Sequence, residues 1–220
     1  MSQPSITELV RMWISGWIVS RGAADPVEQP WGWSIDVGAP TGEVARHVVP
    51  EPTEAEVRKL AEGITAPTTW LKLFADDATV RPWLGPRWRL DVTGFLMTVP
   101  LAPEQPGLPP GYTLTTWTRG GVVRALVRTE DGRPAARGQA GLAGPVAVPD
   151  QIVTDPDHRR RGLGSVVMRS LQATAYGAGA RTGVLVGTAD GQALYTALGW
   201  TTHSRMASLV LDGDSPAEDQ

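Results

Sequence analysis

The sequence contains no cysteine among its 220 residues. Disulfide frameworks, zinc sites with cysteine ligands and thiol nucleophiles are therefore excluded. No apolar run approaches the length of about 18 residues that a membrane-spanning helix needs. The first twenty residues also lack the basic start, apolar stretch and small-residue cleavage site of a secretory signal. We therefore expect a cytoplasmic protein without a membrane partner.

Lysine is almost absent as well, since only Lys59 and Lys72 occur among 20 basic residues. With 23 acidic residues, the formal net charge is −3. A dedicated nucleic-acid binder takes its affinity from a basic surface, so this charge disfavours such a partner. The apolar content of 41% is ordinary for a globular chain, and the length allows one large domain or two small ones.

A proline-rich segment divides the chain. Residues 100–111 contain five prolines, which are incompatible with a helix interior or a central strand and predict a linker. Residues 212–220 combine acidic charge with no apolar anchor and predict a disordered tail. The predicted organisation is an N-terminal unit over 1–99 and a second unit over 112–211.

The two halves have a similar predicted order of elements. The first half reads as strands 32–37 and 44–49, a helix after the Thr53–Glu56 capping box, strand 70–74, a short helix over 77–84 and strand 94–99. The second reads as strands 112–117, 122–129, 134–142 and 146–153, helix 162–176, strand 183–187, helix 192–198 and strand 206–211. A mixed α/β fold of two related units follows from this order.

The segment 153–168, VTDPDHRRRGLGSVVM, carries the clearest chemistry. Gly162 and Gly164 have no Cβ, so their backbone N–H groups can approach an anion, and the first amides of the following helix lack internal partners. Three arginines, Arg159, Arg160 and Arg161, add positive charge where the helix dipole is already positive. This is unfavourable for folding unless an anion binds there, so the segment predicts a phosphate site.

Other interpretations of this segment stay open from the residues alone. A Gly-x-Gly pair also closes tight turns, and the arginines could simply face solvent. A P-loop is excluded because no Gly-Lys-Ser/Thr follows, and the third glycine of a dinucleotide fingerprint is missing. The residues by themselves support generic anion binding.

The segment resembles the acyl-CoA motif of the GNAT superfamily of acyl-CoA-dependent N-acyltransferases, Arg/Gln-x-x-Gly-x-Gly/Ala at a strand-to-helix junction. Here it stands as Arg-Arg-Arg-Gly-Leu-Gly at 159–164. A second family motif follows about 30 residues later as ALYTALGW over 193–200. The resemblance covers roughly 112–211 and implies a GNAT-like central mixed, mostly antiparallel sheet flanked by helices.

The resemblance also implies a donor site for acetyl-CoA, without a metal. In the family the pantetheine arm bonds to the backbone of the strand before the loop, and the loop holds the pyrophosphate. The residues that match these positions are Ile152, Val153, Thr154, Arg159, Arg160, Arg161, Gly162, Leu163, Gly164 and Ser165. Asp190 is added to this donor site because it stands where the family often has asparagine.

The implied reaction is attack of a neutral amine on a thioester, with an acid that protonates the departing thiolate. Tyr195 matches the family's acid, although a tyrosine here could also be a packing residue. The family often places a carboxylate base on the strand before the loop. We select Asp150 as the candidate base, and Asp155 is a second carboxylate nearby. Both could instead be turn or cap residues. Water could also remove the proton from the amine.

The acceptor side departs from the family pattern. Only four residues separate Trp117 from Val122, where the family usually places two helices that form a wall of the acceptor site. Either the N-terminal half supplies this wall, or the chain is a tandem whose first unit has lost its acyl-CoA loop at 50–53; we favour the tandem. Trp31, Trp33 and Trp117 are candidate acceptor-binding residues, or core and interdomain residues.

The leading hypothesis is an N-acetyltransferase that acts on a primary amine of a small molecule, an amino acid or a protein. One alternative is a different donor, either a longer acyl-CoA or an aminoacyl-tRNA. Another is a sensor module that binds acyl-CoA without turnover. A monomer and a homodimer are both compatible with the sequence.

Overall fold

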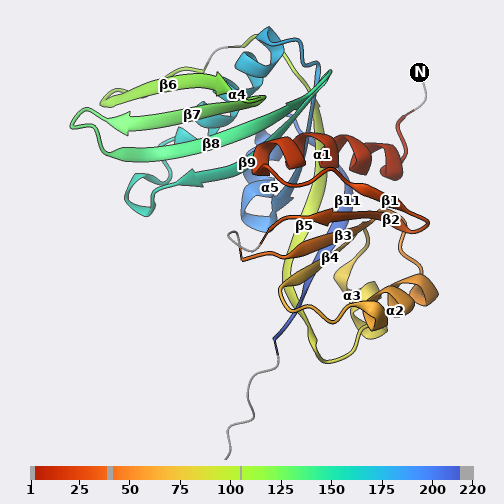
Figure 1. The fold of residues 1–220 in the computed structure, drawn as a ribbon. Coiled ribbons are helices and arrows are strands. Elements are labelled where there is room, and N and C mark those ends of the chain that lie inside the picture. Colours follow the sequence, from red (N-terminus) through yellow and green to blue (C-terminus); the bar gives the residue numbers. More distant parts are fainter. Residues whose placement is uncertain (1–2, 39–41, 105, 214–220) are drawn as a thin grey trace, which may run out of the picture. The chain divides into compact units, whose positions relative to one another are not determined.

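A computed structural model describes residues 3–38, 42–104 and 106–213 (Figure 1). Most of the predicted tail over 212–220 lies outside these residues. The chain separates into two units that are each discontinuous in sequence. The first unit contains Met1–Val10, Ala23–Leu96 and His203–Gln220, and the second contains Arg11–Gly22 and Met97–Thr202. Each is described separately below.

The first unit has a sheet with strand order β1-β2-β3-β4-β11. Its elements are β1 (Val27–Gln29), β2 (Gly32–Asp36), β3 (Ala45–Val49), α2 (Glu54–Gly63), β4 (Thr69–Leu73), α3 (Asp77–Val80), a 3-10 helix (Arg81–Trp83), the start of β5 (Trp88–Pro100) and most of β11 (Thr201–Leu211). β2 and β3 are antiparallel, β3 and β4 are parallel with α2 between them, and β4 and β11 are antiparallel.

The hydrophobic core of this unit includes residues of α2, β4 and β11. Val57 of α2 and Leu71, Leu73 and Leu209 of the strands are fully buried. Thr53 is the N-cap of α2 as predicted. Its hydroxyl, however, donates to the Glu56 carboxylate (2.6 Å) and accepts no backbone N–H, so this contact joins two side chains and is not the backbone bonding of a capping box.

Helix α1 (Ile6–Arg21), which contributes residues to both units, is an element that the sequence analysis did not predict. Its start is a complete capping box. The Ser5 backbone N–H donates to Glu8 Oε2 (2.7 Å), and the Glu8 backbone N–H donates to Ser5 Oγ (3.2 Å). The signal was therefore present in the sequence as Ser-x-x-Glu at positions 5–8.

The second unit has strand order β10-β9-β8-β7-β6, with the end of β5 beside β10. Its elements are β6 (Tyr112–Arg119), β7 (Val122–Thr129), β8 (Pro134–Ala143), β9 (Val146–Thr154), a 3-10 helix (Pro156–His158), α4 (Leu163–Gly177), β10 (Thr182–Thr188) and α5 (Ala189–Ala197). β6 to β9 pair antiparallel, whereas β9 and β10 are parallel with α4 between them.

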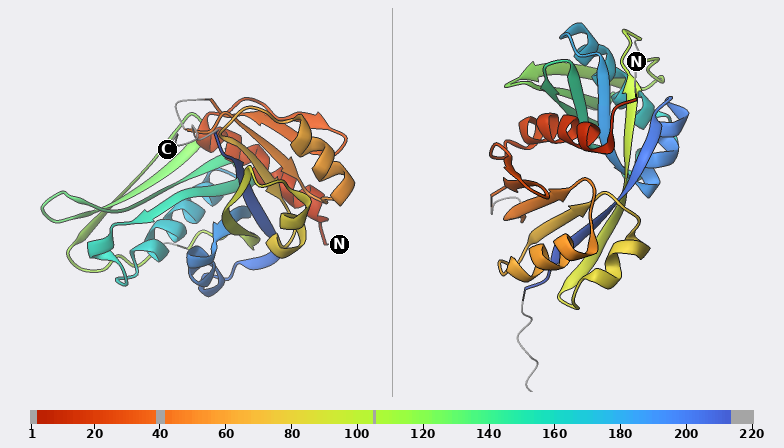
Figure 2. Two further views of the ribbon diagram at one scale, coloured as in Figure 1. Left: turned by 90° about the horizontal axis from the view of Figure 1, so that it is seen from below. Right: turned by 90° about the vertical axis from the view of Figure 1, so that its right-hand side faces the viewer.

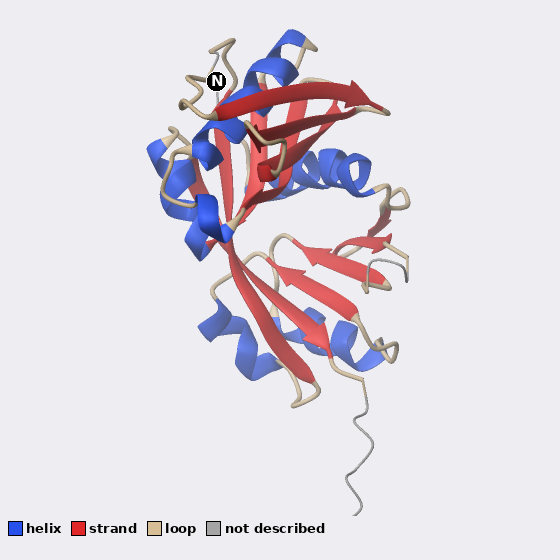
Figure 3. Cartoon of the chain, turned by 90° about the vertical axis from the view of Figure 1, so that its left-hand side faces the viewer, coloured by secondary structure: helices blue, strands red, loops and turns tan. Residues whose placement is uncertain are grey.

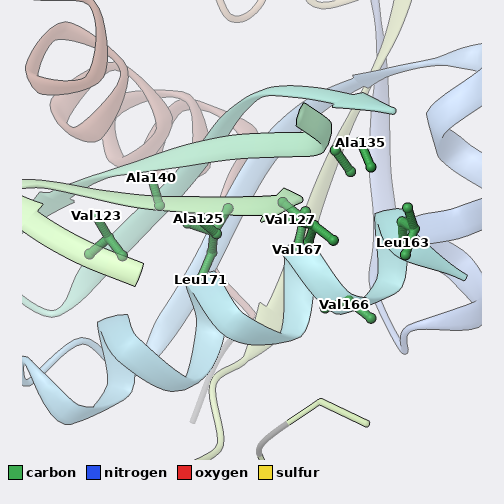
Figure 4. Close-up of a cluster of buried hydrophobic side chains, with 10 residues drawn as sticks. Val123, Ala125, Val127, Ala135, Ala140, Leu163, Val166, Val167 and Leu171 are labelled. Carbon is green, nitrogen blue, oxygen red and sulfur yellow. The ribbon is translucent and has the colours of Figure 1, made fainter. Parts of the chain in front are cut away.

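Helix α4 covers one face of this sheet. In Figure 4 the side chains of Val123, Ala125 and Val127 on β7 and of Ala140 on β8 lie in a buried cluster with Val167 and Leu171 of α4. Alternate residues of a strand point to opposite faces, so residues 124, 126 and 128 face away from α4.

Residues 11–21 of α1 pack against the C-terminal half of β8. A Cβ at Gly141 would lie 1.9 Å from the Gly16 carbonyl oxygen, so only glycine permits this approach. Gln139 Nε2 also donates to the Ser20 carbonyl (2.7 Å). The contact orients the end of α1 over β8.

The predicted fold class is confirmed: the chain is mixed α/β, with mostly antiparallel strand pairs and flanking helices (Figures 2 and 3). Of the linker predicted over 100–111, Pro100 is the last residue of β5, and residues 101–111 form no helix or strand where they are described. Within the described ranges, no helix is long and apolar enough to cross a membrane.

Candidate functional site

The parallel strands β9 and β10 separate soon after they begin. They pair only at Thr182 with Val146 and at Gly183 with Ala147, although both strands, which lie fully within the described residues, continue for several more. Backbone N–H and C=O groups beyond that point are not used in the ladder between these two strands. Such groups need other partners, and a bound molecule can supply them.

A bulge in β9 contributes to the separation. Gln139 of β8 pairs with Asp150 and Arg137 pairs with Val153, so two residues of β9 stand opposite one of β8. Gln151, in the bulge, has a φ of 54°, which is in the left-handed region. A bulge bends and twists the strand that carries it, so the end of β9 turns away from its earlier direction.

A pocket of about 810 Å³ lies beside this separation, at the N-terminus of α4. Its lining residues are Ile152, Val153, Thr154, Arg159, Arg160, Gly162, Leu163, Gly164, Ser165, Thr188, Asp190, Gly191, Ala193, Leu194 and Tyr195. The structure thus brings together ten of the eleven predicted donor-site residues and the candidate acid. The sequence analysis missed Thr188, Gly191, Ala193 and Leu194; the last two lie within the second family motif.

The loop before α4 leaves amides available for an anion. Gly162 adopts a φ of 77° as the N-cap, and the Val166 N–H donates to the Gly162 carbonyl (3.1 Å). The amides of Leu163, Gly164 and Ser165 precede this first bond and have no intrahelical acceptor. Together with the helix dipole, they form a site at which negative charge is stabilised.

Arg161 lies outside the lining of the pocket. Its Nη1 donates to the Tyr112 hydroxyl (3.0 Å) and its Nη2 to the Asp157 carbonyl (3.2 Å). The Tyr112 hydroxyl is also hydrogen-bonded to Nδ1 of His158 (3.0 Å). These contacts connect the loop to β6, and the predicted phosphate role of Arg161 stays a prediction.

Tyr195 lies on α5 and is 9% exposed. Its ring lies close to two glycines: a Cβ at Gly187 would be 2.6 Å from Tyr195 Cε2, and one at Gly191 would be 2.8 Å away. Burial raises the pKa of the Tyr195 phenol, and the negative charge of Asp150 raises it further. The phenol therefore keeps its proton through the neutral range and can act as a proton donor.

Asp150, the candidate base, lies just before the bulge and not in the pocket lining. Its Oδ1 accepts from Arg21 Nη2 (2.9 Å), and its Oδ2 accepts from Arg21 Nε and from the Ser20 hydroxyl (3.0 Å). Both partners come from α1, at the far end of the sequence. No local motif could have indicated them.

The three candidate acceptor tryptophans do not form one cluster within a unit. Trp33 is buried on β2, and Trp31 lines a different pocket of about 720 Å³ in the first unit, where its ring meets His47 edge-on (5.6 Å between centroids). Trp117 belongs to the second unit and is 42% exposed on β6. Their predicted role in acceptor binding stays a prediction.

His47 is the titratable group of the Trp31 pocket whose pKa is shifted. Burial lowers the pKa of its imidazole, and the nearby Asp36 opposes this shift. Its Nδ1 is hydrogen-bonded to the Ser34 hydroxyl (2.9 Å). Across residues 3–38, 42–104 and 106–213, no group of three or more potential ligands from His, Cys, Asp and Glu could hold a metal ion.

Comparison with solved structures supports the fold. A GCN5-related N-acetyltransferase from Kribbella flavida is 20% identical, with a TM-score of 0.62 over 94% of this chain and 99% of that one. A GNAT-family protein from Novosphingobium aromaticivorans is 20% identical, with a TM-score of 0.56 over 94% and 97%. A tandem GNAT protein from the clavulanic acid biosynthesis pathway is 16% identical, with a TM-score of 0.52 over 73% and 69%. These likenesses concern the fold.

The search of curated proteins found no match. The model of the Acetyltransferase (GNAT) family matches residues 72–200. The match begins well before the region 112–211 over which the sequence motifs indicated the resemblance, and it includes the separated strands, the loop and α5. This match spans more than half of the sequence, and the chain belongs to the GNAT family of acetyltransferases.

Proposed function

We propose that the protein transfers an acetyl group from acetyl-CoA to a primary amine. The observation that carries this proposal is the pocket where β9 and β10 separate, which has helix amides at one end and a buried, protonated tyrosine in its lining. A thioester with a phosphate-bearing tail needs both features. The acceptor is an amine of a small molecule, an amino acid or a protein.

The donor is proposed to bind in two parts. The pyrophosphate accepts hydrogen bonds from the amides of Leu163, Gly164 and Ser165, and Arg159 and Arg160 neutralise its charge. The pantetheine arm bonds to backbone groups of residues 152–154. Because these groups lie beyond the last β9–β10 pair, binding sacrifices no hydrogen bond between the two strands.

The transfer step then follows from the position of Tyr195. The amine nitrogen attacks the thioester carbonyl carbon, the carbon–sulfur bond breaks, and the phenol protonates the departing thiolate. The raised pKa keeps that proton in place until the thiolate forms. Asp150 is our candidate to receive the amine's proton; because Arg21 holds both of its oxygens, we expect this pair to open during transfer.

We also propose that the chain is a tandem of two related halves, over 1–99 and 112–211. The order β2-β3-α2-β4 matches β8-β9-α4-β10, with an antiparallel and then a parallel pair in both cases. The first copy has Pro-Glu-Pro-Thr at 50–53 where the second has its glycine loop. The acyl-CoA site would then occur only in the second copy. A cytoplasmic location stays an expectation from the sequence.

The experiment that tests the function is calorimetric titration of the purified protein with acetyl-CoA, followed by a thiol-release assay with a panel of amines. Binding in the micromolar range together with amine-dependent release of CoA would support the proposal. Saturable binding without thiol release for any amine would favour a sensor. Absence of binding would redirect the search to other donors.

A further inference from the structure

One face of the second unit's sheet carries a cluster of arginines. On β7, Arg124, Leu126 and Arg128 point away from α4, because the intervening Val123, Ala125 and Val127 lie in the cluster with α4. The sheet register then defines their neighbours. Arg124 pairs with Trp117 of β6, and Leu126 pairs with Arg137 of β8. We call Trp117, Arg124, Leu126, Arg128 and Arg137 the arginine face.

The arginine face is accessible and its charges are not neutralised. Trp117 and Arg137 are exposed, and the other three residues are half-buried. Within the described part of the chain, none of the three arginines makes a side-chain hydrogen bond or an ion pair. Arg124 pairs with Gln139 of β8, which in turn pairs with Asp150 of β9. The carboxylate of Asp150 already forms an ion pair with Arg21.

The spacing of these charges is unfavourable without a partner. Arg137 faces Leu126, so it is the diagonal neighbour of Arg124, and diagonal neighbours lie about 7–8 Å apart. Arg128 lies beyond an irregularity in the register, where it pairs with Pro134. Like charges directly opposite each other on adjacent strands destabilise a sheet, and diagonal like charges repel more weakly because they lie farther apart. The protein as a whole is acidic, with a net charge of −3, so this cluster is not a sample of a generally basic surface.

We propose that the arginine face binds an extended acidic segment of a polypeptide, which is the acceptor. The acceptor assignment rests on the proposed acetyltransferase function, whereas binding itself does not. An extended chain places alternate side chains on one face about 6.6 Å apart, which is close to the spacing of the arginines. Guanidinium groups bind carboxylates through paired hydrogen bonds, and Trp117 and Leu126 offer apolar contact between them.

The location of the face fits this role. Val153 pairs with Arg137 and also lines the donor pocket, so the register connects the arginine face to the edge of that pocket. A segment bound on the arginine face can therefore extend its terminal amine toward the thioester. A long polyanion such as a nucleic acid is disfavoured by the net acidity of the rest of the protein.

The test is fluorescence anisotropy with a labelled peptide of alternating glutamate and threonine. Its controls are the same peptide with glutamine in place of glutamate and a labelled single-stranded oligothymidylate. The double variant combines Arg124→Gln with Arg137→Gln, and the control variant combines Arg58→Gln with Arg89→Gln, which removes two exposed arginines of the first unit. Thermal unfolding and acetyl-CoA calorimetry of each variant show whether the fold and the donor site are intact.

We expect the glutamate peptide to bind in a salt-dependent manner and the double variant to bind it at least about tenfold more weakly, because charge-assisted hydrogen bonds are lost. The double variant should unfold at the same or a higher temperature, since repulsion is removed. Equal binding of the glutamine peptide, or an unaffected double variant, would overturn the inference. Tighter binding of oligothymidylate that depends on the same arginines would replace the peptide with a nucleic acid. If the peptide binds but acetyl-CoA does not, the proposed function fails and the binding face stands.

Discussion

Replacement of Gly164 by aspartate tests the donor site most directly. Gly164 lies in the first turn of α4 and lines the pocket. A Cβ there would be 3.1 Å from Leu194 Cδ2 and 3.8 Å from Thr154 Oγ1. The nearer atom is the end of a flexible side chain, so a small movement of Leu194 accommodates the substitution. We therefore expect Gly164→Asp to fold.

The charge of the new side chain sets the expected magnitude. If a phosphate accepts the amide of residue 164, the carboxylate lies roughly 4 Å from it, and two like charges at that distance cost about 4 kcal/mol at an effective dielectric constant near 20. This corresponds to a Kd for acetyl-CoA that is about a thousandfold higher. In the free protein the same carboxylate lies at a helix N-terminus beside Arg159 and Arg160, which stabilises the fold by about 0.3–1 kcal/mol.

The assay is calorimetry with acetyl-CoA on the parent, Gly164→Asp and the uncharged, similarly shaped Gly164→Asn, with thermal unfolding of each. The aspartate variant should lose binding while its unfolding temperature is unchanged or raised. The asparagine variant should retain most of the affinity. Equal affinities for the aspartate variant and the parent would refute the phosphate assignment, and equal losses in both variants would show that size, not charge, is responsible.

Three further predictions concern individual side chains. Tyr195→Phe should lower kcat by a factor of about 10²–10⁴ and leave the Kd for acetyl-CoA unchanged; an unchanged kcat would exclude the acid role. In the parent, any loss of rate at alkaline pH that is due to ionisation of this phenol should occur above its ordinary pKa of 10.0. Gly187→Ala places a Cβ 2.6 Å from Tyr195 Cε2, so denaturant titration should show that the free energy of unfolding falls by about 1–3 kcal/mol. Steady-state kinetics should show that kcat falls by a larger factor than the affinity for the donor. Because the pKa of His47 is lowered in the folded state from 6.5, its contribution to stability is complete above that pH and is lost as the pH falls through the lower folded value. Urea titrations should show His47→Gln losing less stability on acidification than the parent, and parallel pH profiles would contradict this.

The phosphate loop could be predicted from the sequence because its determinants are contiguous. Gly162, Gly164 and the start of α4 are neighbours in the chain, and local backbone geometry suffices to leave the helix amides available. The start of α1 was equally local, and the Ser5–Glu8 box that begins it went unused in the prediction. The positions of most strands followed from their alternation and from turn residues for the same reason.

Other parts of the site depend on contacts between distant residues. The partner of Asp150 is Arg21, 129 positions away, and no spacing in the sequence indicates it. β9 and β10 pair at only two residue pairs before they separate, and β9 contains a bulge near that point. Neither follows from strand propensity, because each strand by itself could have paired along its full length.

The arginine face shows this division most clearly. The alternation on β7 placed Arg124 and Arg128 on one side of a strand and Val123 and Val127 on the other, and this the sequence determined by itself. Only the tertiary structure decided that α4 covers the valine side and that Arg137 of β8 joins the arginines. A shift of one residue in the register of β8 would have turned Arg137 to the opposite face, and that register is set by cross-strand packing between residues far apart in the chain.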